Sequence, residues 1–332
     1  MSVTATAAVD NPELVAWELS GSAASFDRSG GADEIIEALA GFTPGLRVLL
    51  TGIEGVARAD LVTIVEDSTS AGLEVTITPQ DPRVLDRSLL RHLVSVGLTA
   101  VSVPLDGPDR QTHDIIHGHP GHFDAAVGVT RWATDLGLPV EVTTAVGRST
   151  LDWIDHLAAR VLALAATRWS LSFIIPDERG VDREAVRPNE AEEMLEWLVG
   201  LDTATAVDIA IVQAPMYERI ALSASPQHDT AASSLVAGDN LLYIGPDGTI
   251  APSGALEIDL GRIPDDDLVE LYRSDPLLQS IRDPSTRKGK CGICEFNEVC
   301  GGSRSRAYAN FGDPLQQDPL CPFVPAMVAR TG

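Results

Sequence analysis

The stretch KCGICEFNEVCGG, residues 290–302, contains three of the four cysteines in this chain of 332 residues. They form a CxxCxxxxxC pattern at Cys291, Cys294 and Cys300, and the fourth, Cys321, follows further along. This spacing lets one loop bring three sulfurs around a single metal centre, with Cys321 as the fourth ligand. The pattern predicts an iron–sulfur cluster or a structural zinc, and disulfides or free thiols are the third interpretation.

The composition indicates which cellular compartment and which kinds of binding partner to expect. The formal net charge is −24, so nucleic acid is not expected as a partner, because its phosphates would be repelled. No apolar run approaches the ~20 residues that a membrane helix needs, and residues 1–11 lack the positively charged start of a signal peptide. We expect a cytoplasmic protein, whose reducing surroundings favour metal-bound thiols over disulfides. Lys288 and Lys290 are the only lysines, which fits either a GC-rich genome that encodes Arg in place of Lys or an acidic surface adapted to high salt.

Short apolar runs alternate with amphipathic stretches from about residue 14 to residue 212. Strands are expected at Leu14–Leu19, Leu46–Thr51, Leu73–Thr78, Ala100–Pro104, Val140–Ala145 and Trp169–Ile175, with Val207–Val212 as a further edge strand. Helices are expected at Ala32–Ala40, Asp60–Ala71, Arg83–Val96, Phe123–Leu136 and Leu151–Ala165. This alternation is typical of βαβ units and a parallel sheet. It predicts an α/β fold, a partial (β/α)6 TIM-like barrel, in which chemistry lies at the C-terminal strand ends.

The rest of the chain divides into a connection and a small domain. Residues 223–237 are rich in Ser, Ala and polar residues, which predicts a linker between a barrel domain, residues 12–222, and a C-terminal domain, residues 238–325. The turn sequence Gly245-Pro246-Asp247-Gly248 predicts a β-hairpin of Asn240–Ile244 and Thr249–Ala251. The cysteine cluster then completes this domain.

The cysteine region resembles a known family in more than its spacing. The strings GKCGICEF (289–296), CGGSRSRAYA (300–309), GDPL (312–315) and DPLC (318–321) are similar to those of radical S-adenosylmethionine (SAM) enzymes with a C-terminal SPASM or twitch extension. Upstream, SVPLDGPD (102–109) with THD (112–114) resembles the family's fourth-strand region, and YIGPDG (243–248) its hairpin. The resemblance points to the branch that contains proteins of alternative haem and haem d1 biosynthesis.

The chain departs from this family after the first strand. Radical SAM enzymes carry CxxxCxxC there, and in this sequence Ala23, Asp27 and Gly30 occupy the cysteine places. The resemblance therefore implies a degenerate member that lacks the SAM-cleaving cluster.

A second departure follows the second strand. The family has Gly-Gly-Glu-Pro there, which holds the methionine amino group of SAM, and this chain has GIEG at residues 52–55. Gly52 and Glu54 remain as cofactor-binding candidates. The bulk of Ile53, in place of a glycine that lets the backbone approach a ligand, makes SAM binding doubtful.

The extension keeps the ligands of one of its two cluster sites. Ser253 and Arg304 stand where the resemblance places cysteines of the first auxiliary cluster. The four cysteines that remain match the second auxiliary site, with every ligand present. The resemblance thus implies one 4Fe–4S cluster, with structural zinc as the alternative. Full ligation leaves no iron open to substrate, so the cluster would be structural or would pass electrons.

Carboxylates at three predicted strand ends are weak catalytic candidates. Glu18, Glu54 and Asp106 would lie at the barrel mouth, where they can do acid–base work or contact a ligand. They are also explained as polar remnants of a lost SAM site or, for Asp106, as a turn residue.

Two other polar groups have alternative interpretations. The four histidines of residues 113–122 are ordinary loop residues or a metal site. Arg304 and Arg306 are solvated or paired arginines, or else they neutralise the cluster or bind an anionic group.

These features predict an iron–sulfur protein on a radical SAM scaffold that does not cleave SAM reductively. It would be a non-radical partner, electron-transfer or substrate-binding protein in a tetrapyrrole-like cofactor pathway or in peptide modification. Its partners would be a sister radical SAM enzyme, or a small-molecule or peptide substrate. The alternative is a repurposed enzyme that binds SAM or another small ligand at the barrel mouth, and the second alternative is a structural zinc protein.

Overall fold

The computed structural model describes residues 11–20, 31–42, 44–175, 184–227 and 234–329. Within this part of the chain, 11 strands form one sheet. They are β1 (Leu14–Glu18), β2 (Arg47–Thr51), β3 (Glu74–Ile77), β4 (Ala100–Pro104), β5 (Val140–Val146), β6 (Arg168–Phe173), β7 (Asp208–Val212), β8 (Ser234–Leu235), β9 (Leu241–Ile244), β10 (Thr249–Ala251) and β11 (Gly261–Arg262). The order is β11-β10-β9-β1-β2-β3-β4-β5-β6-β7-β8. All neighbours from β1 to β8 are parallel.

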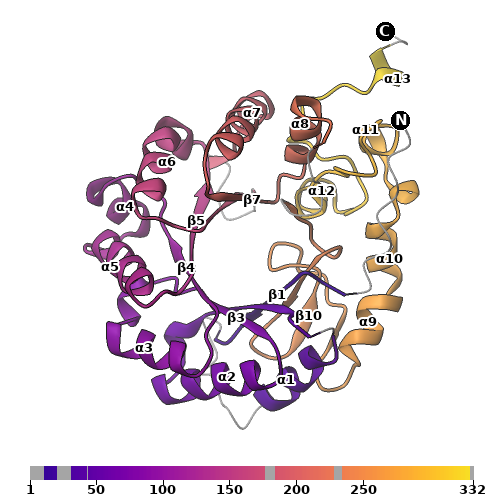
Figure 1. The fold of residues 1–332 in the computed structure, drawn as a ribbon. Coiled ribbons are helices and arrows are strands. Elements are labelled where there is room, and N and C mark those ends of the chain that lie inside the picture. Colours follow the sequence, from indigo (N-terminus) through magenta and orange to yellow (C-terminus); the bar gives the residue numbers. More distant parts are fainter. Residues whose placement is uncertain (1–10, 21–30, 43, 176–183, 228–233, 330–332) are drawn as a thin grey trace.

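The sheet curves into an open barrel with its helices on the outside (Figure 1). The barrel helices are α1 (Ala32–Ala40), α2 (Arg58–Ser70), α3 (Arg87–Ser95), α4 (Arg110–His117), α5 (His122–Asp135), α6 (Ile154–Ala163), α7 (Pro188–Ala204) and α8 (Met216–Ala224), with short 3-10 turns η1 (Ile53–Gly55), η2 (Pro82–Val84) and η3 (Ser149–Trp153). The expected α/β partial barrel is confirmed. None of the helices in the described residues has the length and apolar character that a membrane crossing requires.

Two apolar clusters hold the barrel together. One joins β1–β4 to α1–α3 and includes Trp17, and the other joins β5–β7 to α6–α8 and includes Trp169. The side chains of Cys300 and Cys321 pack against the second cluster. The cysteine region is therefore seated on the β5–β7 half of the barrel.

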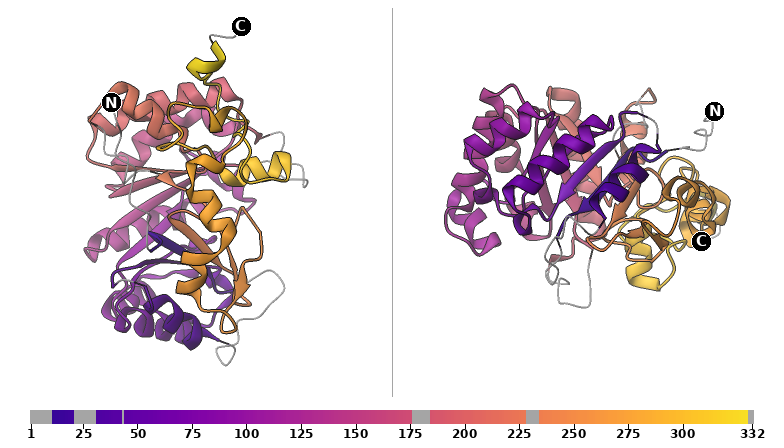
Figure 2. Two further views of the ribbon diagram at one scale, coloured as in Figure 1. Left: turned by 90° about the vertical axis from the view of Figure 1, so that its right-hand side faces the viewer. Right: turned by 90° about the horizontal axis from the view of Figure 1, so that it is seen from below.

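The C-terminal extension begins with the expected hairpin. After β11 it continues as α9 (Leu268–Ser274), α10 (Pro276–Arg282), η5 (Pro284–Thr286), α11 (Gly289–Gly292), α12 (Arg304–Phe311) and α13 (Ala326–Ala329). Strands β9 and β10 are antiparallel, and β9 also pairs in parallel with β1. Gly248 closes the hairpin turn with φ +82°, where a side chain would meet the carbonyl oxygen of Ile263 at 2.6 Å. Figure 2 shows the extension, in orange and yellow, packed along one side of the barrel.

Three elements differ from the expectations. The residues expected as an edge strand form β7, which is internal because β8 pairs with it. Residues 223–237, expected as a linker, contain the end of α8 and all of β8, whose two residues are too few to give a strand pattern. Helix α4 lies in the stretch that was expected as a loop. Asp109 caps its N-terminus, because the Asp109 carboxylate accepts the backbone N–H of Thr112 at 2.9 Å.

Candidate metal centre and barrel mouth

The four cysteines line one cavity, which is partly open to solvent. Cys291 comes from α11, and the other three come from the turns around it. Gly301 and Gly302 follow Cys300 with φ of +64° and +75°, which glycine adopts readily. A side chain at Gly302 would lie 2.7 Å from Asp318 and 3.2 Å from the sulfur of Cys291. The glycine pair thus lets the loop turn back tightly against the first cysteine.

The separation of the sulfurs distinguishes between kinds of metal centre. In the described residues, no three cysteine sulfurs lie within 4.8 Å of one another. Four thiolates on one tetrahedral zinc, at about 2.3 Å each, would place their sulfurs about 3.8 Å apart. A cubane spreads its cysteine ligands further, because each sulfur binds a different iron. In every set of three cysteines, at least one pair of sulfurs is thus farther apart than thiolates on one zinc ion would be.

Two arginine side chains lie at or near this cavity. Arg219 of α8 lines it, and Arg287 is close enough to interact electrostatically with Cys300 and Cys291. The Nε atoms of both arginines are buried and have no hydrogen-bond partner in the described residues. Burial raises the pKa of the Cys294, Cys300 and Cys321 thiols. Buried donors of this kind fit an anionic group bound between the four thiols, because such donors are costly to leave without an acceptor.

Arg304 and Arg306 are buried, so of the expected alternatives, solvated or paired arginines, solvation is wrong for both and pairing remains. Arg304 donates to the carbonyls of Gly302 (3.0 Å), Pro314 (2.6 Å) and Gln316 (2.9 Å), and also to that of Gly301. Arg306 donates to the carbonyl of Gln213 at 2.8 Å and lies 3.3 Å from a carboxylate oxygen of Asp318. Both side chains shape the cysteine loop, and Arg306 also connects it to the end of β7.

The carboxylates at the ends of β1 and β2 have separate partners. Glu18 accepts a hydrogen bond from the hydroxyl of Tyr243 on β9. Glu54 accepts the backbone N–H of Asp81 at 3.0 Å. The sequence therefore located both side chains at strand ends, and the structure shows that each also joins neighbouring segments.

The turn after β2 is tightly packed. Gly52 has φ +65°, and a side chain there would lie 2.6 Å from the carbonyl oxygen of Ser20. The side chain of Ile53 is only 3% exposed and belongs to the apolar cluster of the first barrel half. Its bulk is thus accommodated in the core. The places occupied by Ala23, Asp27 and Gly30 lie outside the described residues.

Asp106 is held at the end of β4 by two hydrogen bonds. Its Oδ1 accepts the backbone N–H of Ala145 at 2.6 Å, and its Oδ2 lies 2.8 Å from Nε2 of His117. It thereby fixes the end of β5 and the end of α4 relative to each other. This accounts for Asp106 structurally, beside any contact with a ligand.

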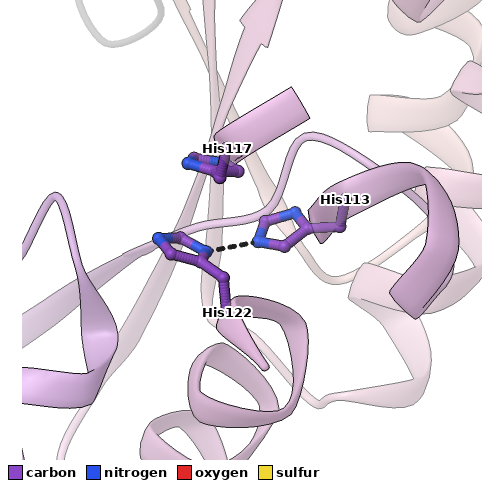
Figure 3. A group of neighbouring side chains, drawn as sticks. All are labelled: His113, His117 and His122. Carbon is purple, nitrogen blue, oxygen red and sulfur yellow. Dashed lines mark hydrogen bonds between the residues drawn. The ribbon is translucent and has the colours of Figure 1, made fainter. Parts of the chain in front are cut away.

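Three of the four histidines of residues 113–122, namely His113, His117 and His122, come together (Figure 3), and the first two of them bond Asp106. Nδ1 of His113 accepts the backbone N–H of Asp106 at 3.1 Å, so the ring's proton is assigned to Nε2. That Nε2 donates to Nδ1 of His122 at 2.7 Å, and Nε2 of His122 donates to the carbonyl of Gln80 at 2.9 Å. The chain of bonds joins the segments that follow β3 and β4.

These hydrogen bonds argue against a metal ion at the histidines. One nitrogen from each of His113, His117 and His122 lies within 4.8 Å of the others. Both nitrogens of His113 and His122 are already used, however, and the rings of His117 and His122 stack at 3.9 Å and 13°. Nearly parallel rings cannot direct their in-plane lone pairs at one ion. Burial lowers the pKa of His113 to about 4 and also lowers that of His122, so both of these rings are neutral at pH 7.

The architecture is a radical SAM fold with a SPASM-like C-terminal region that contains the cysteines. The chain superposes on Streptococcus suis SuiB bound to S-adenosylmethionine with a TM-score of 0.71 and 14% identity, over 95% of this chain and 78% of that one. It superposes on native anSMEcpe with bound AdoMet with a TM-score of 0.70 and 13% identity, over 93% and 94% of the two chains. At these identities the likeness concerns the fold alone.

Sequence similarity is consistent with this fold. Residues 27–161 match the Radical SAM superfamily. An AdoMet-dependent heme synthase of Methanosarcina barkeri is 27% identical over 95% of this chain and 97% of its own length. One from Nitratidesulfovibrio vulgaris is 27% identical over 84% and 79%. A PqqA peptide cyclase of Rhodopseudomonas palustris is 26% identical over 84% and 74%. The chain is thus related to heme synthases and to peptide cyclases.

Sequence reasoning missed the two arginines at the cysteine cavity. Arg219 lies in a barrel helix about 70 residues before the first cysteine, and Arg287 precedes it without a recognisable pattern. Only the fold, which brings α8 against the cysteine loop, shows that Arg219 lines the cavity.

Proposed function

We propose that this chain is an iron–sulfur protein whose barrel mouth binds SAM or another small ligand. In this proposal Cys291, Cys294, Cys300 and Cys321 hold its one 4Fe–4S cluster. One observation carries the cluster assignment: the four sulfurs line a single cavity beside buried arginine donors that have no acceptor. An anionic cluster with inorganic sulfides would supply that acceptor.

The mouth of the barrel supports the small-ligand part of the proposal. The sequence-based doubt about SAM rested on the bulk of Ile53, and that side chain packs into the core. The backbone of the turn at Gly52 is therefore not covered by it. Glu54 stays at the end of β2, and Glu18 at the end of β1. Relatives named AdoMet-dependent heme synthase, and neighbours solved with S-adenosylmethionine, make SAM the first ligand to test.

The chemistry of the proposed protein differs from reductive SAM cleavage. The sequence has no cysteine before Cys291, so the mouth offers no set of three thiolates for a second cluster. When bound, the C-terminal cluster would supply single electrons. Glu18 and Tyr243 would hold or move a proton at the mouth. A tetrapyrrole or a peptide is the substrate class that the related heme synthases and peptide cyclases suggest.

The same absence of cysteines favours a second candidate function. A protein with one fully ligated cluster could serve an intact radical SAM enzyme as an electron-transfer or substrate-binding partner. In that case the ligand site at the mouth would be dispensable, and the cluster would not.

Metal analysis and calorimetry on anaerobically purified protein test these proposals. We expect about four irons and four sulfides per chain, heat of SAM binding that is lost in Glu54→Ala, and no deoxyadenosine after addition of dithionite. Glu37→Ala, at an exposed glutamate of α1, is the control. One zinc without sulfide would refute the cluster. A cluster without binding of SAM, S-adenosylhomocysteine or a tetrapyrrole would refute the mouth proposal and leave the partner function.

A further inference from the structure

Arg219 reaches the cysteine cavity from the barrel, because it lies on α8 and not in the extension. Its side chain is 6% exposed. One guanidinium nitrogen, Nη2, bonds both carboxylate oxygens of Glu192 on α7, at 2.6 and 2.5 Å. The guanidinium carbon lies 4.7 Å from the ring centre of Phe323, close after Cys321. The Nε atom of the same guanidinium group has no hydrogen-bond partner in the described residues.

The surrounding contacts fix this side chain relative to the cysteine loop. Gln213, between β7 and α8, accepts the hydroxyl of Ser303 at 2.9 Å and a guanidinium N–H of Arg306 at 2.8 Å. Both donors follow Cys300 closely in the loop. The helix that carries Arg219 is therefore anchored to the same loop that supplies the third cysteine.

We propose that Arg219 sets the reduction potential of the cluster held by the four cysteines, with Glu192 as its counter-charge. This inference rests on the proposed function. A cubane with four thiolate ligands is anionic, and it gains one further negative charge when an external donor gives it an electron. A buried cation at the cavity stabilises that added charge, because the local dielectric constant is low. It therefore raises the potential.

Arg219 is the cation on which this can be tested without dismantling the loop. Arg304 bonds four backbone carbonyls of the cysteine region, and Arg287 bonds the backbone of Asn297. Replacing either removes part of the loop's own structure. Arg219 stays charged, because arginine is not deprotonated in proteins and Glu192 pairs with it.

Substitutions at the two ends of the Arg219–Glu192 pair distinguish charge from structure. Arg219→Gln removes the cation and lowers the potential, while Glu192→Gln removes the opposing charge and raises it. Arg219→Lys keeps the charge and keeps most of the effect. A purely structural role predicts that Arg219→Gln and Glu192→Gln shift the potential in the same direction, since both break the same ion pair.

The measurement is an anaerobic redox titration followed by EPR, with iron and sulfide counted for each variant. Arg262→Gln, at an exposed arginine paired with Asp247, is the matched control and leaves the potential unchanged. Shifts of opposite sign support the inference; equal signs or no shift overturn it. If Arg219→Gln loses the cluster, the other two variants still test the inference: it requires a raised potential in Glu192→Gln and a nearly unchanged potential in Arg219→Lys. Absence of iron and sulfide in the unmodified protein would instead refute the proposed function.

Discussion

Acidification should destabilise this protein through His113. The pKa of His113 is lowered from 6.5 to about 4, chiefly because burial disfavours the imidazolium and secondly because His117 lies beside it. Between these values the unfolded chain takes up a proton and the folded chain does not, so stability is full above pH 6.5 and falls as the pH decreases toward 4. The linkage relation gives a loss of about 2 kcal/mol between pH 7 and pH 5, and about 3 kcal/mol by pH 4. His122 acts in the same direction.

Urea unfolding at pH 7 and pH 5 measures this loss, in the unmodified protein and in His113→Gln. The variant has no imidazole to protonate, so its loss should be smaller by about 2 kcal/mol, whatever its stability at pH 7. His119→Gln, at an exposed histidine of the same loop, controls for removal of a histidine. Parallel losses in the unmodified protein and in His113→Gln would show that the hydrogen-bonded chain does not hold His113 neutral.

Three further substitutions test the packing of the mouth and the cysteine loop. Gly52→Ala should lower the free energy of unfolding by more than ~1 kcal/mol, which is the cost of an alanine in the left-handed conformation, because the added side chain meets the carbonyl of Ser20 at 2.6 Å. Gly72→Ala, also at positive φ but in open space, is the control in thermal melts, and the difference between the two variants measures the effect of the close contact. Arg304→Met should lose about 3 kcal/mol or more of unfolding free energy, because four carbonyls of the cysteine region lose their donor; a loss under 1 kcal/mol would contradict the structural role. Cys300→Ser should abolish most iron binding on anaerobic reconstitution while leaving the far-ultraviolet circular dichroism of the barrel unchanged, and full iron content would remove Cys300 from the ligand set.

The barrel could be predicted from the sequence because the patterns that indicate its strands and helices are local. Apolar runs such as those of β2 and β5 alternate with helices within short stretches, and the turn at residues 245–248 identifies the hairpin. The cysteine pattern located the candidate metal centre for the same reason. Arg219 was not predictable, because its role depends on α8 packing against a loop that follows it by many residues. The burial of Ile53 in the core was also not predictable, because a motif gives the residue's identity and not the direction of its side chain.

The extension is part of the barrel's own sheet. Strand β9 pairs in parallel with β1 from Leu14 to Trp17, so the boundary expected at residue 238 lies within one continuous sheet. The hydroxyl of Tyr243 on β9 bonds Glu18 at the mouth, and Gln213 after β7 bonds the loop that follows Cys300. The C-terminal extension thus contacts the barrel at both sides of its opening, through its hairpin at β1 and through its cysteine loop after β7.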